Sequence, residues 1–191
     1  TVESVVGLLG VAMITGLVFA KFSRPKARIF FSNKAVITRH EGQKTLMFRV
    51  GNERANYVAE ASLHATIALP GTTREGRKFT RMLDLPLVRN RSPMFFLTWT
   101  VLHVIDEQSP LYTLTEEELN SSRAFLICTL TGHDSTMGQT IHARHIYNVS
   151  DIAWNAHFVD IMQPSTDDNG FSIDYRHFHD LEPDETSTDV S

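Results

Sequence analysis

The sequence is nearly devoid of cysteine: Cys128 is the only one in 191 residues, so no disulfide bond can form within the chain. Cys128 stands in the apolar run Phe125–Leu130, where a free thiol is usually a small buried hydrophobe, and this favours a reducing compartment. Only 10 glycines and 7 prolines occur, which excludes collagen-like and low-complexity chains. A chain of this length buries a sizeable core without cross-links.

The strings that mark common catalytic sites are missing too. There is no G-x-S-x-G, G-x-x-x-x-G-K-[ST] or G-x-G-x-x-G, so the sequence lacks the fingerprints of the common hydrolases, P-loop enzymes and dinucleotide-binding enzymes. Nine histidines invite a metal-site interpretation, but His142 and His145 lie three apart in a predicted strand and therefore face opposite sides. A metal hydrolase that uses His177 and His179 stays open as a weaker hypothesis. We predict no enzyme, no metal and no cofactor.

Neither sign of charge is in large excess, yet the charges are unevenly distributed along the chain. The formal net charge is -4, whereas residues 1–28 hold one acidic and four basic residues and so carry +3, which leaves -7 for the remainder. This balance argues against a nucleic-acid binder. An acidic body with one basic cluster is typical of a protein whose N-terminal end meets an anionic surface. The basic cluster consists of Lys21, Arg24, Lys26 and Arg28.

One long uncharged run is present, the 16 residues Val5–Ala20. As an α-helix it covers about 24 Å at about 1.5 Å per residue, less than the roughly 30 Å of a bilayer core. The chain opens with Thr1 rather than Met and the basic cluster follows directly, so we interpret the run as part of a truncated transmembrane helix with its basic end in the cytoplasm. Ala12 and Gly16 share one helix face with Ala20, which suggests a helix bundle. A helix buried in a soluble core is the alternative.

The basic cluster surrounds Pro25. Proline disfavours helical geometry for the residue before it, so the helix is predicted to end near Arg24. Long basic side chains at such a place either extend to the membrane surface and anchor the helix, or form a specific site for an anionic lipid. The residues alone leave both interpretations open, and both require a membrane.

After Arg28 the chain changes to short segments rich in Val, Ile, Thr and aromatic residues, separated by turn residues. Many short strands at this spacing predict a mainly β fold, a β-sandwich. From Glu182 onward the acidic composition predicts a disordered tail. The predicted strands are Ile29–Phe31, Ala35–His40, Thr45–Asn52, Tyr57–Leu69, Lys78–Leu83, Phe95–Val104, Ala124–Thr131 and Thr140–Tyr147.

Turn and helix signals complete this picture. Thr115 followed three residues later by Glu118 predicts a capping box that opens one short helix. The segment between Thr131 and Gln139 is a polar loop with a glycine near each end, which by itself fits an ordinary hairpin connection. The predicted corners are Glu41–Gly42, Pro70–Gly71, Glu75–Gly76, Ser92–Pro93, Ser109–Pro110 and Asp168–Gly170.

Four strings carry a family resemblance that spans nearly the whole chain. They are TGLVFAKFSRPKARIFFSNKAVI (15–37), LMFRVGNERANYVAEA (46–61), HVIDEQSPLY (103–112) and IDYRHF (173–178). In this order and spacing they resemble the inward-rectifier potassium channels, most closely the prokaryotic branch. The matching part would be the C-terminal end of the inner helix together with the cytoplasmic domain. No TVGYG string occurs, so these residues do not contain the potassium selectivity filter.

The resemblance implies a homotetramer in the cell (inner) membrane, with its C-terminal domain in the cytoplasm and K+ as the permeant ion. Residues 1–22 would end the transmembrane inner helix, 23–34 would form a basic linker, 35–180 an immunoglobulin-like β-sandwich, and 181–191 an acidic tail. A membrane-anchored β-sandwich that binds a protein partner through a sheet edge is the alternative function.

The resemblance also assigns two gates. Gly7 falls at the inner-helix hinge, and Phe19 at the constriction where the helices cross; a ring of four phenylalanines stops ions by dewetting. The 131–139 loop corresponds to the second narrow point, at the top of the cytoplasmic pore. Its gate residues would be Gly132, His133, Met137 and Gly138.

The remaining assignments concern lipid, coupling and block. The basic positions that sense phosphoinositides in this family, which are anionic phospholipids, match Lys21, Arg24, Lys26 and Arg28. The resemblance implies lipid binding and does not assign whether the lipid opens or closes the channel. Arg54 matches a residue that couples the domain to the membrane end, and Glu60 an acid that lines the cytoplasmic pore. Strong rectifiers carry further acids at the positions of Thr131 and Val11, so block by Mg2+ or polyamine is predicted to be weak.

Overall fold

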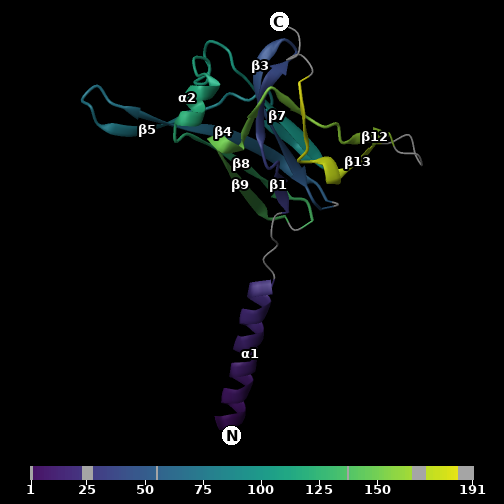
Figure 1. The fold of residues 1–191 in the computed structure, drawn as a ribbon. Coiled ribbons are helices and arrows are strands. Elements are labelled where there is room, and N and C mark those ends of the chain that lie inside the picture. Colours follow the sequence, from purple (N-terminus) through teal and green to yellow (C-terminus); the bar gives the residue numbers. More distant parts are fainter. Residues whose placement is uncertain (1, 23–27, 55, 137, 165–170, 185–191) are drawn as a thin grey trace, which may run out of the picture.

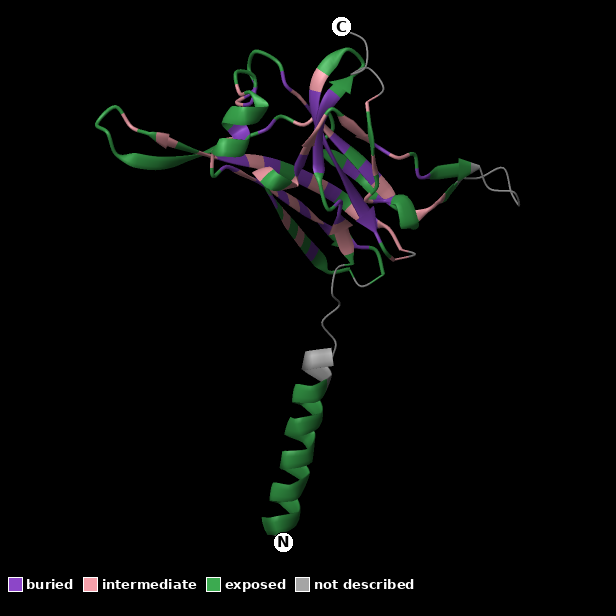
Figure 2. Cartoon of the chain, viewed as in Figure 1, coloured by how far each residue is buried: buried purple, intermediate pink, exposed green. Residues whose placement is uncertain are grey.

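The computed structural model of the chain describes residues 2–22, 28–54, 56–136, 138–164 and 171–184 (Figure 1). The N-terminal helix α1 spans Val2–Phe22 and is apolar over nearly its whole length. Every residue from Val2 to Val18 is exposed, so over this range α1 packs against no other described part of the chain (Figure 2). Within the described residues, no helix combines the length and apolarity that a membrane crossing needs. The transmembrane assignment of residues 1–22 therefore stays a prediction.

Two five-stranded sheets form the body of the fold, and this confirms the predicted β-sandwich (Figure 1). The first sheet has the order β1 (Ile29–Phe31), β3 (Gln43–Asn52), β2 (Ala35–His40) and β10 (Ile152–Trp154), with β7 (Thr98–Val104) also paired to β3. The second has the order β5 (Lys78–Asp84), β4 (Val58–Thr72), β8 (Phe125–Asp134) and β9 (Thr140–Asn148), with β6 (Arg91–Phe95) also paired to β4. All pairs are antiparallel except β2 with β10.

The core lies between the two sheets. Alternate residues of β4 and β8 point inward, as a strand that is half solvated requires, and Leu63 and Leu126 are fully buried. The Phe48 and Tyr147 rings, from opposite sheets, have centroids 5.9 Å apart, and the Tyr147 hydroxyl is 3.1 Å from Ser32 Oγ. β1 lies inside the segment expected to be a linker, so the sandwich begins at Ile29.

The outer face of the first sheet is covered as well, which is why β3 is buried on both faces from Thr45 to Asn52. The cover is the two-stranded ribbon of β11 (Ala156–Phe158) and β14 (Leu181–Pro183). Asp184, just after β14, accepts a hydrogen bond from Thr38 Oγ1 and lies 3.0 Å from His157 Nδ1. The prediction of a disordered tail from Glu182 is therefore wrong as far as Asp184; residues 185–191 lie outside the described residues.

The short elements bear out two local predictions. Helix α2 (Glu116–Ser121) has Thr115 as N-cap, and both hydrogen bonds of its capping box with Glu118 are present. Glu41 and Gly42, with φ of 50° and 80°, form the two-residue turn between β2 and β3. The other short elements are β12 (Met162–Pro164), β13 (Phe171–Ile173) and the single 3-10 turns η1 (Val149–Asp151) and η2 (Tyr175–His177).

Three predictions about the strands are wrong. Pro70–Gly71 is not a corner but part of β4, where the β4–β5 hairpin has passed the last pair with β8 at Ala68, so no neighbour on that side needs the missing proline N–H. Ser92–Pro93 lies in β6, an edge strand that tolerates proline for the same reason. The run 95–104 is two strands, because the chain leaves the second sheet at Phe95 and enters the first at Thr98.

Candidate functional site

The candidate site is the turn that follows β8, together with the chain segments that hold it. β8 continues through Gly132 and His133 to Asp134, so the loop is shorter than the 131–139 segment that the sequence predicted. Asp134 closes the turn: its N–H donates to the Gln139 carbonyl at 2.9 Å, and its carbonyl accepts from Gly138 N at 2.8 Å. Gly138 has a φ of 61°, which glycine adopts at little cost. Met137 lies outside the described residues.

Gly132 is required by packing within a single chain. A Cβ at Gly132 would lie 2.5 Å from Val58 Cγ1, 3.1 Å from the Ala59 carbonyl oxygen and 3.2 Å from Ala61 Cα. β4 approaches β8 this closely because its register shifts between Ala59 and Ser62. The physical reason for a glycine here is thus the contact between two strands.

Glu60 lies at this shift, where two residues of β4, Glu60 and Ala61, stand opposite the single residue Gly132 of β8. Its φ is 51°, a left-handed conformation that is uncommon for residues other than glycine, asparagine and aspartate. A bulge of this kind re-aims side chains, and Glu60 is exposed to solvent. Backbone strain of this sort is found mainly at functional positions, so the structure gives Glu60 a local distinction that composition does not show.

Arg54 reaches the turn directly. Its Nη1 atom is 3.2 Å from Asp134 Oδ2, and the Asp134 side chain is only 6% exposed. The other Asp134 oxygen, Oδ1, accepts from Thr136 N at 2.8 Å. The Tyr57 carbonyl accepts from Ser135 N at 3.2 Å, so two separate contacts join the 52–57 corner to the turn. Because Asp134 is buried, this pair is screened less than an exposed ion pair.

The 52–57 corner keeps its shape through a buried asparagine. Asn52 is 3% exposed; its Nδ2 donates to the Asn56 carbonyl at 2.7 Å, and its Oδ1 accepts from Arg54 N at 3.1 Å. The Tyr175 hydroxyl donates to the Leu97 carbonyl at 3.1 Å and lies 3.4 Å from the Asn52 carbonyl. These contacts connect the GNER string with the IDYRHF string.

The start of β1 is held at the same end of the domain. The Phe30 ring lies 2.4 to 3.0 Å from where a Cβ of Gly51 would stand, so only glycine permits this packing. Phe178 is fully buried, and its ring centroid is 4.5 Å from that of Phe30. The chain that emerges from the predicted linker is therefore fixed on the sandwich from its first strand.

The predicted lipid and inner-helix residues are only partly described. Arg28 is exposed, and its Nη1 is 3.8 Å from Glu53 Oε2, a weak surface pair. Gly7 lies within α1 with nothing within 4 Å of its would-be Cβ. Lys21 and Phe19 also belong to α1, but their side chains lie outside the described features, and Arg24 and Lys26 lie outside the described residues altogether.

The histidines and the cysteine have structural surroundings. The His145 ring stacks on Phe31 with centroids 5.6 Å apart, whereas His142 faces solvent, as the strand pattern predicted. His177 Nδ1 is 2.7 Å from Asp180 Oδ2. Over the described parts of the chain, no cluster of three or more His, Cys, Asp or Glu residues is arranged to hold a metal ion. Cys128 is buried, as predicted, and burial raises the pKa of its thiol, so it remains protonated.

Sequence reasoning missed two buried ionisable residues. Arg49 Nη2 donates to the Val159 carbonyl at 2.6 Å, and its guanidinium lies over the Phe158 ring; desolvation lowers the pKa of Arg49. His103 Nδ1 is 2.7 Å from the Pro86 carbonyl and its Nε2 is 2.8 Å from Ser109 Oγ, while burial lowers the pKa of its imidazole. The HVIDEQSP string is thus explained by a buried histidine that joins two loops.

Residues 29–189 match a family model described as "Inward rectifier potassium channel C-terminal domain". The chain is 40% identical over 181 residues to "Inward rectifier potassium channel Kirbac3.1" of Paramagnetospirillum magnetotacticum, covering 95% of this chain and 61% of the relative. It is 31% identical to "ATP-sensitive inward rectifier potassium channel 12" of Gallus gallus, covering 93% and 43%. The chain thus spans less than two thirds of the length of these relatives.

Proposed function

The chain belongs to the inward rectifier potassium channel family, and from that premise we propose that it is the pore-lining and gating part of a tetrameric, membrane-embedded channel that conducts K+ through a cytoplasmic pore. The observation that carries the proposal is the match of residues 29–189 to the C-terminal domain of such channels. The relatives are named as channels, which are not enzymes, in agreement with the absence of a predicted catalytic site.

The turn after β8 is the proposed cytoplasmic gate. Gly132, His133, Met137 and Gly138 would surround the ion path, and the Arg54–Asp134 pair supports this assignment because it fixes the base of the turn. A gate that is rigid at its base and narrow at its tip responds as a unit when its support moves. Arg54, in the corner that follows the first sheet, is the proposed coupling residue.

The membrane end is proposed to respond to anionic phospholipid. Lys21, Arg24, Lys26 and Arg28 would meet phosphate groups at the inner surface of the membrane, with Gly7 as hinge and Phe19 as constriction in α1. The weak Arg28–Glu53 pair supports this assignment, because an exposed pair at 3.8 Å gives up its arginine to a phosphate at little cost.

Glu60 is proposed to be the acidic residue of the cytoplasmic pore. Four copies around one axis would concentrate K+ and attract Mg2+ or polyamines. Thr131, which stands near it on β8, adds no second charge, so block is expected to be weak. Steep voltage-dependent block by micromolar spermine would contradict this expectation.

The proposal is tested on a channel that contains the missing filter. This chain is joined to the part of the Kirbac3.1 channel that precedes the matched residues, and the purified protein is reconstituted in liposomes. K+ flux that responds to phosphoinositide in the bilayer is expected. A pure tetramer with no K+ flux under any lipid condition would contradict the channel function, and failure to form a tetramer would contradict the assembly.

A further inference from the structure

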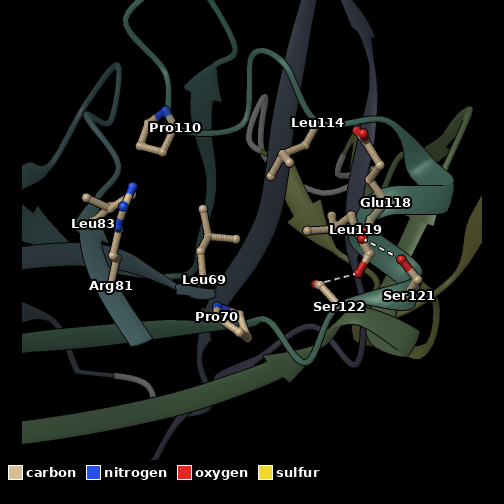
Figure 3. Close-up of a pocket in the computed structure, with 11 residues that line it drawn as sticks. Leu69, Pro70, Arg81, Leu83, Pro110, Leu114, Glu118, Leu119, Ser121 and Ser122 are labelled. Carbon is tan, nitrogen blue, oxygen red and sulfur yellow. Dashed lines mark hydrogen bonds between the residues drawn. The ribbon is translucent and has the colours of Figure 1, made fainter. Parts of the chain in front are cut away.

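A second, separate feature lies at the opposite end of β4, where the β4–β5 hairpin projects from the sandwich (Figure 1). We call residues 69–84 the arm. Between the base of the arm and helix α2 is a pocket of about 510 Å³, within the range of small-molecule sites (Figure 3). We call it the arm pocket. It lies at the other end of β4 from Glu60, and the channel proposal assigns it no role.

The walls of the arm pocket are mainly aliphatic. Leu69 and Leu83 come from the arm, and Leu114 and Leu119 from α2 and the segment before it. The first three are only half-buried, although they pack against the main core, so part of their apolar surface faces the pocket. Gly71 lines the same space without a side chain and leaves room above the hairpin.

One cationic side chain enters this apolar space. Arg81 is the register partner of Leu69, so the two side chains stand on the same face of the hairpin, and Figure 3 shows the Arg81 guanidinium pointing toward Pro110. Among the described residues, the Arg81 side chain has no ion-pair or hydrogen-bond partner.

The acidic residue of the pocket, Glu118, forms no ion pair with Arg81 in the described structure. Glu118 Oε2 accepts hydrogen bonds from Thr115 N at 3.0 Å and from Thr115 Oγ1 at 3.2 Å, so the carboxylate is held by the capping box of α2. The neighbouring hydroxyls are engaged as well: Ser121 Oγ donates to the Glu118 carbonyl and Ser122 Oγ to that of Leu119. The arm pocket therefore offers an aliphatic surface and a single uncommitted cation.

We propose that the arm pocket binds a small amphipathic carboxylate, whose apolar body lies against the leucines and whose head group pairs with Arg81. The pairing is a charge-assisted hydrogen bond at the rim, and the apolar body supplies most of the affinity. Because the pocket is lined by both β5 and α2, the bound molecule would hold the arm against α2. The inference does not depend on the channel function.

The test uses two soluble probes that differ only in the head group, sodium hexanoate and hexan-1-ol. Each is titrated into the 191-residue chain in detergent, and leucine methyl resonances are followed by NMR. Hexanoate is expected to bind in the millimolar range and to shift Leu69, Leu83 and Leu114, and hexanol to bind several-fold more weakly. Shifts confined to Leu8 and Leu9 of α1 would show partition into detergent and would contradict the proposal.

Two matched variants separate the head-group contact from general charge. Arg81→Gln removes the cation of the pocket and is expected to weaken hexanoate binding about fivefold while leaving hexanol unchanged. Arg77→Gln removes a cation from the same arm, outside the pocket lining, and is expected to change neither. Both sites are exposed, so the fold should be kept, which the unperturbed methyl spectrum checks. Equal affinities for the two probes, or equal effects of the two variants, would overturn the proposal.

Discussion

The two ends of β4 have opposite surroundings. At Val58–Ser62 the strand is pressed against β8 at Gly132, carries a strained residue at Glu60 and adjoins the corner that holds Asp134. At Leu69–Thr72 it has passed β8 and projects with β5 into solvent, where Phe79 and Met82 are exposed. One strand thus joins an end that many contacts hold in place to an end that pairs with β5 alone. The fixed end suits a gate that must keep its shape, and the free end suits recognition.

The largest expected difference between the two ends is in the cost in unfolding free energy of replacing a glycine by alanine. Gly132→Ala forces a Cβ against the buried Val58 side chain and the β4 backbone, so it is expected to lower the free energy of unfolding by about 2 kcal/mol. Gly71→Ala meets only the Phe79 carbonyl oxygen, at 3.9 Å, and is expected to change it by less than about 0.5 kcal/mol. Urea unfolding of the chain measures both. Equal losses would mean that the ends of β4 are equally constrained.

The next effect compares two ion pairs. Asp134→Asn removes the charge that faces Arg54 at a buried site and is expected to cost about 1 to 3 kcal/mol in unfolding free energy. Glu53→Gln disrupts the exposed pair with Arg28 and is expected to cost less than about 0.5 kcal/mol. A double-mutant cycle with Arg54→Gln isolates the coupling at Asp134, and a coupling energy near zero would refute the fixed base of the turn.

A stabilising change is expected at Glu60. Glu60→Gly relieves the left-handed strain at a φ of 51° and is expected to raise the unfolding free energy by about 1 kcal/mol. Glu60→Gln keeps the side-chain size and the strain, and is expected to leave stability unchanged. If both variants behaved alike, the effect would belong to the charge rather than to the backbone. Denaturant midpoints for the three proteins distinguish these outcomes.

The smallest expected effect is the loss of unfolding free energy in acid that arises from His103. His103 joins the segments at Pro86 and Ser109, and burial lowers the pKa of its imidazole below that of the unfolded chain. Unfolding therefore takes up a proton, so the stability that neutral His103 contributes is fully present above about pH 6.5 and declines as the pH falls through the folded pKa. His103→Asn is expected to flatten the fall in unfolding free energy between pH 7 and pH 5. His142→Gln, at an exposed site, should leave it unchanged.

The sequence predicted most strands because burial on one face produces alternation, and β4 and β8 follow it closely. It failed where one apolar run serves two sheets, and it did not predict the three-residue strands β10 to β14. The run 95–104 is continuous in composition, but its two halves pair with different sheets. The sequence predicts a corner at Pro70 because nothing in it shows that the pairing of β4 with β8 ends at Ala68.

The candidate site shows the same limit. Gly132 and Arg54 could be named through family resemblance, yet Asp134, eighty residues beyond Arg54, carries no local signal that marks it as the partner. The strain at Glu60 is likewise invisible in composition, because it arises from the register shift between two strands. The partner of Arg54 and the conformation of Glu60 are both set by pairing between distant segments rather than by residue type.

The most direct test is K+ flux through the chimaeric channel in liposomes, compared between Asp134→Asn and Glu53→Gln. If the fixed end of β4 carries the gate, Asp134→Asn changes flux and its response to phosphoinositide severalfold at equal tetramer yield, whereas Glu53→Gln leaves the maximal flux unchanged. Wild-type flux and lipid response in the Asp134→Asn channel would contradict the assignment of the turn after β8 as a gate held by Arg54.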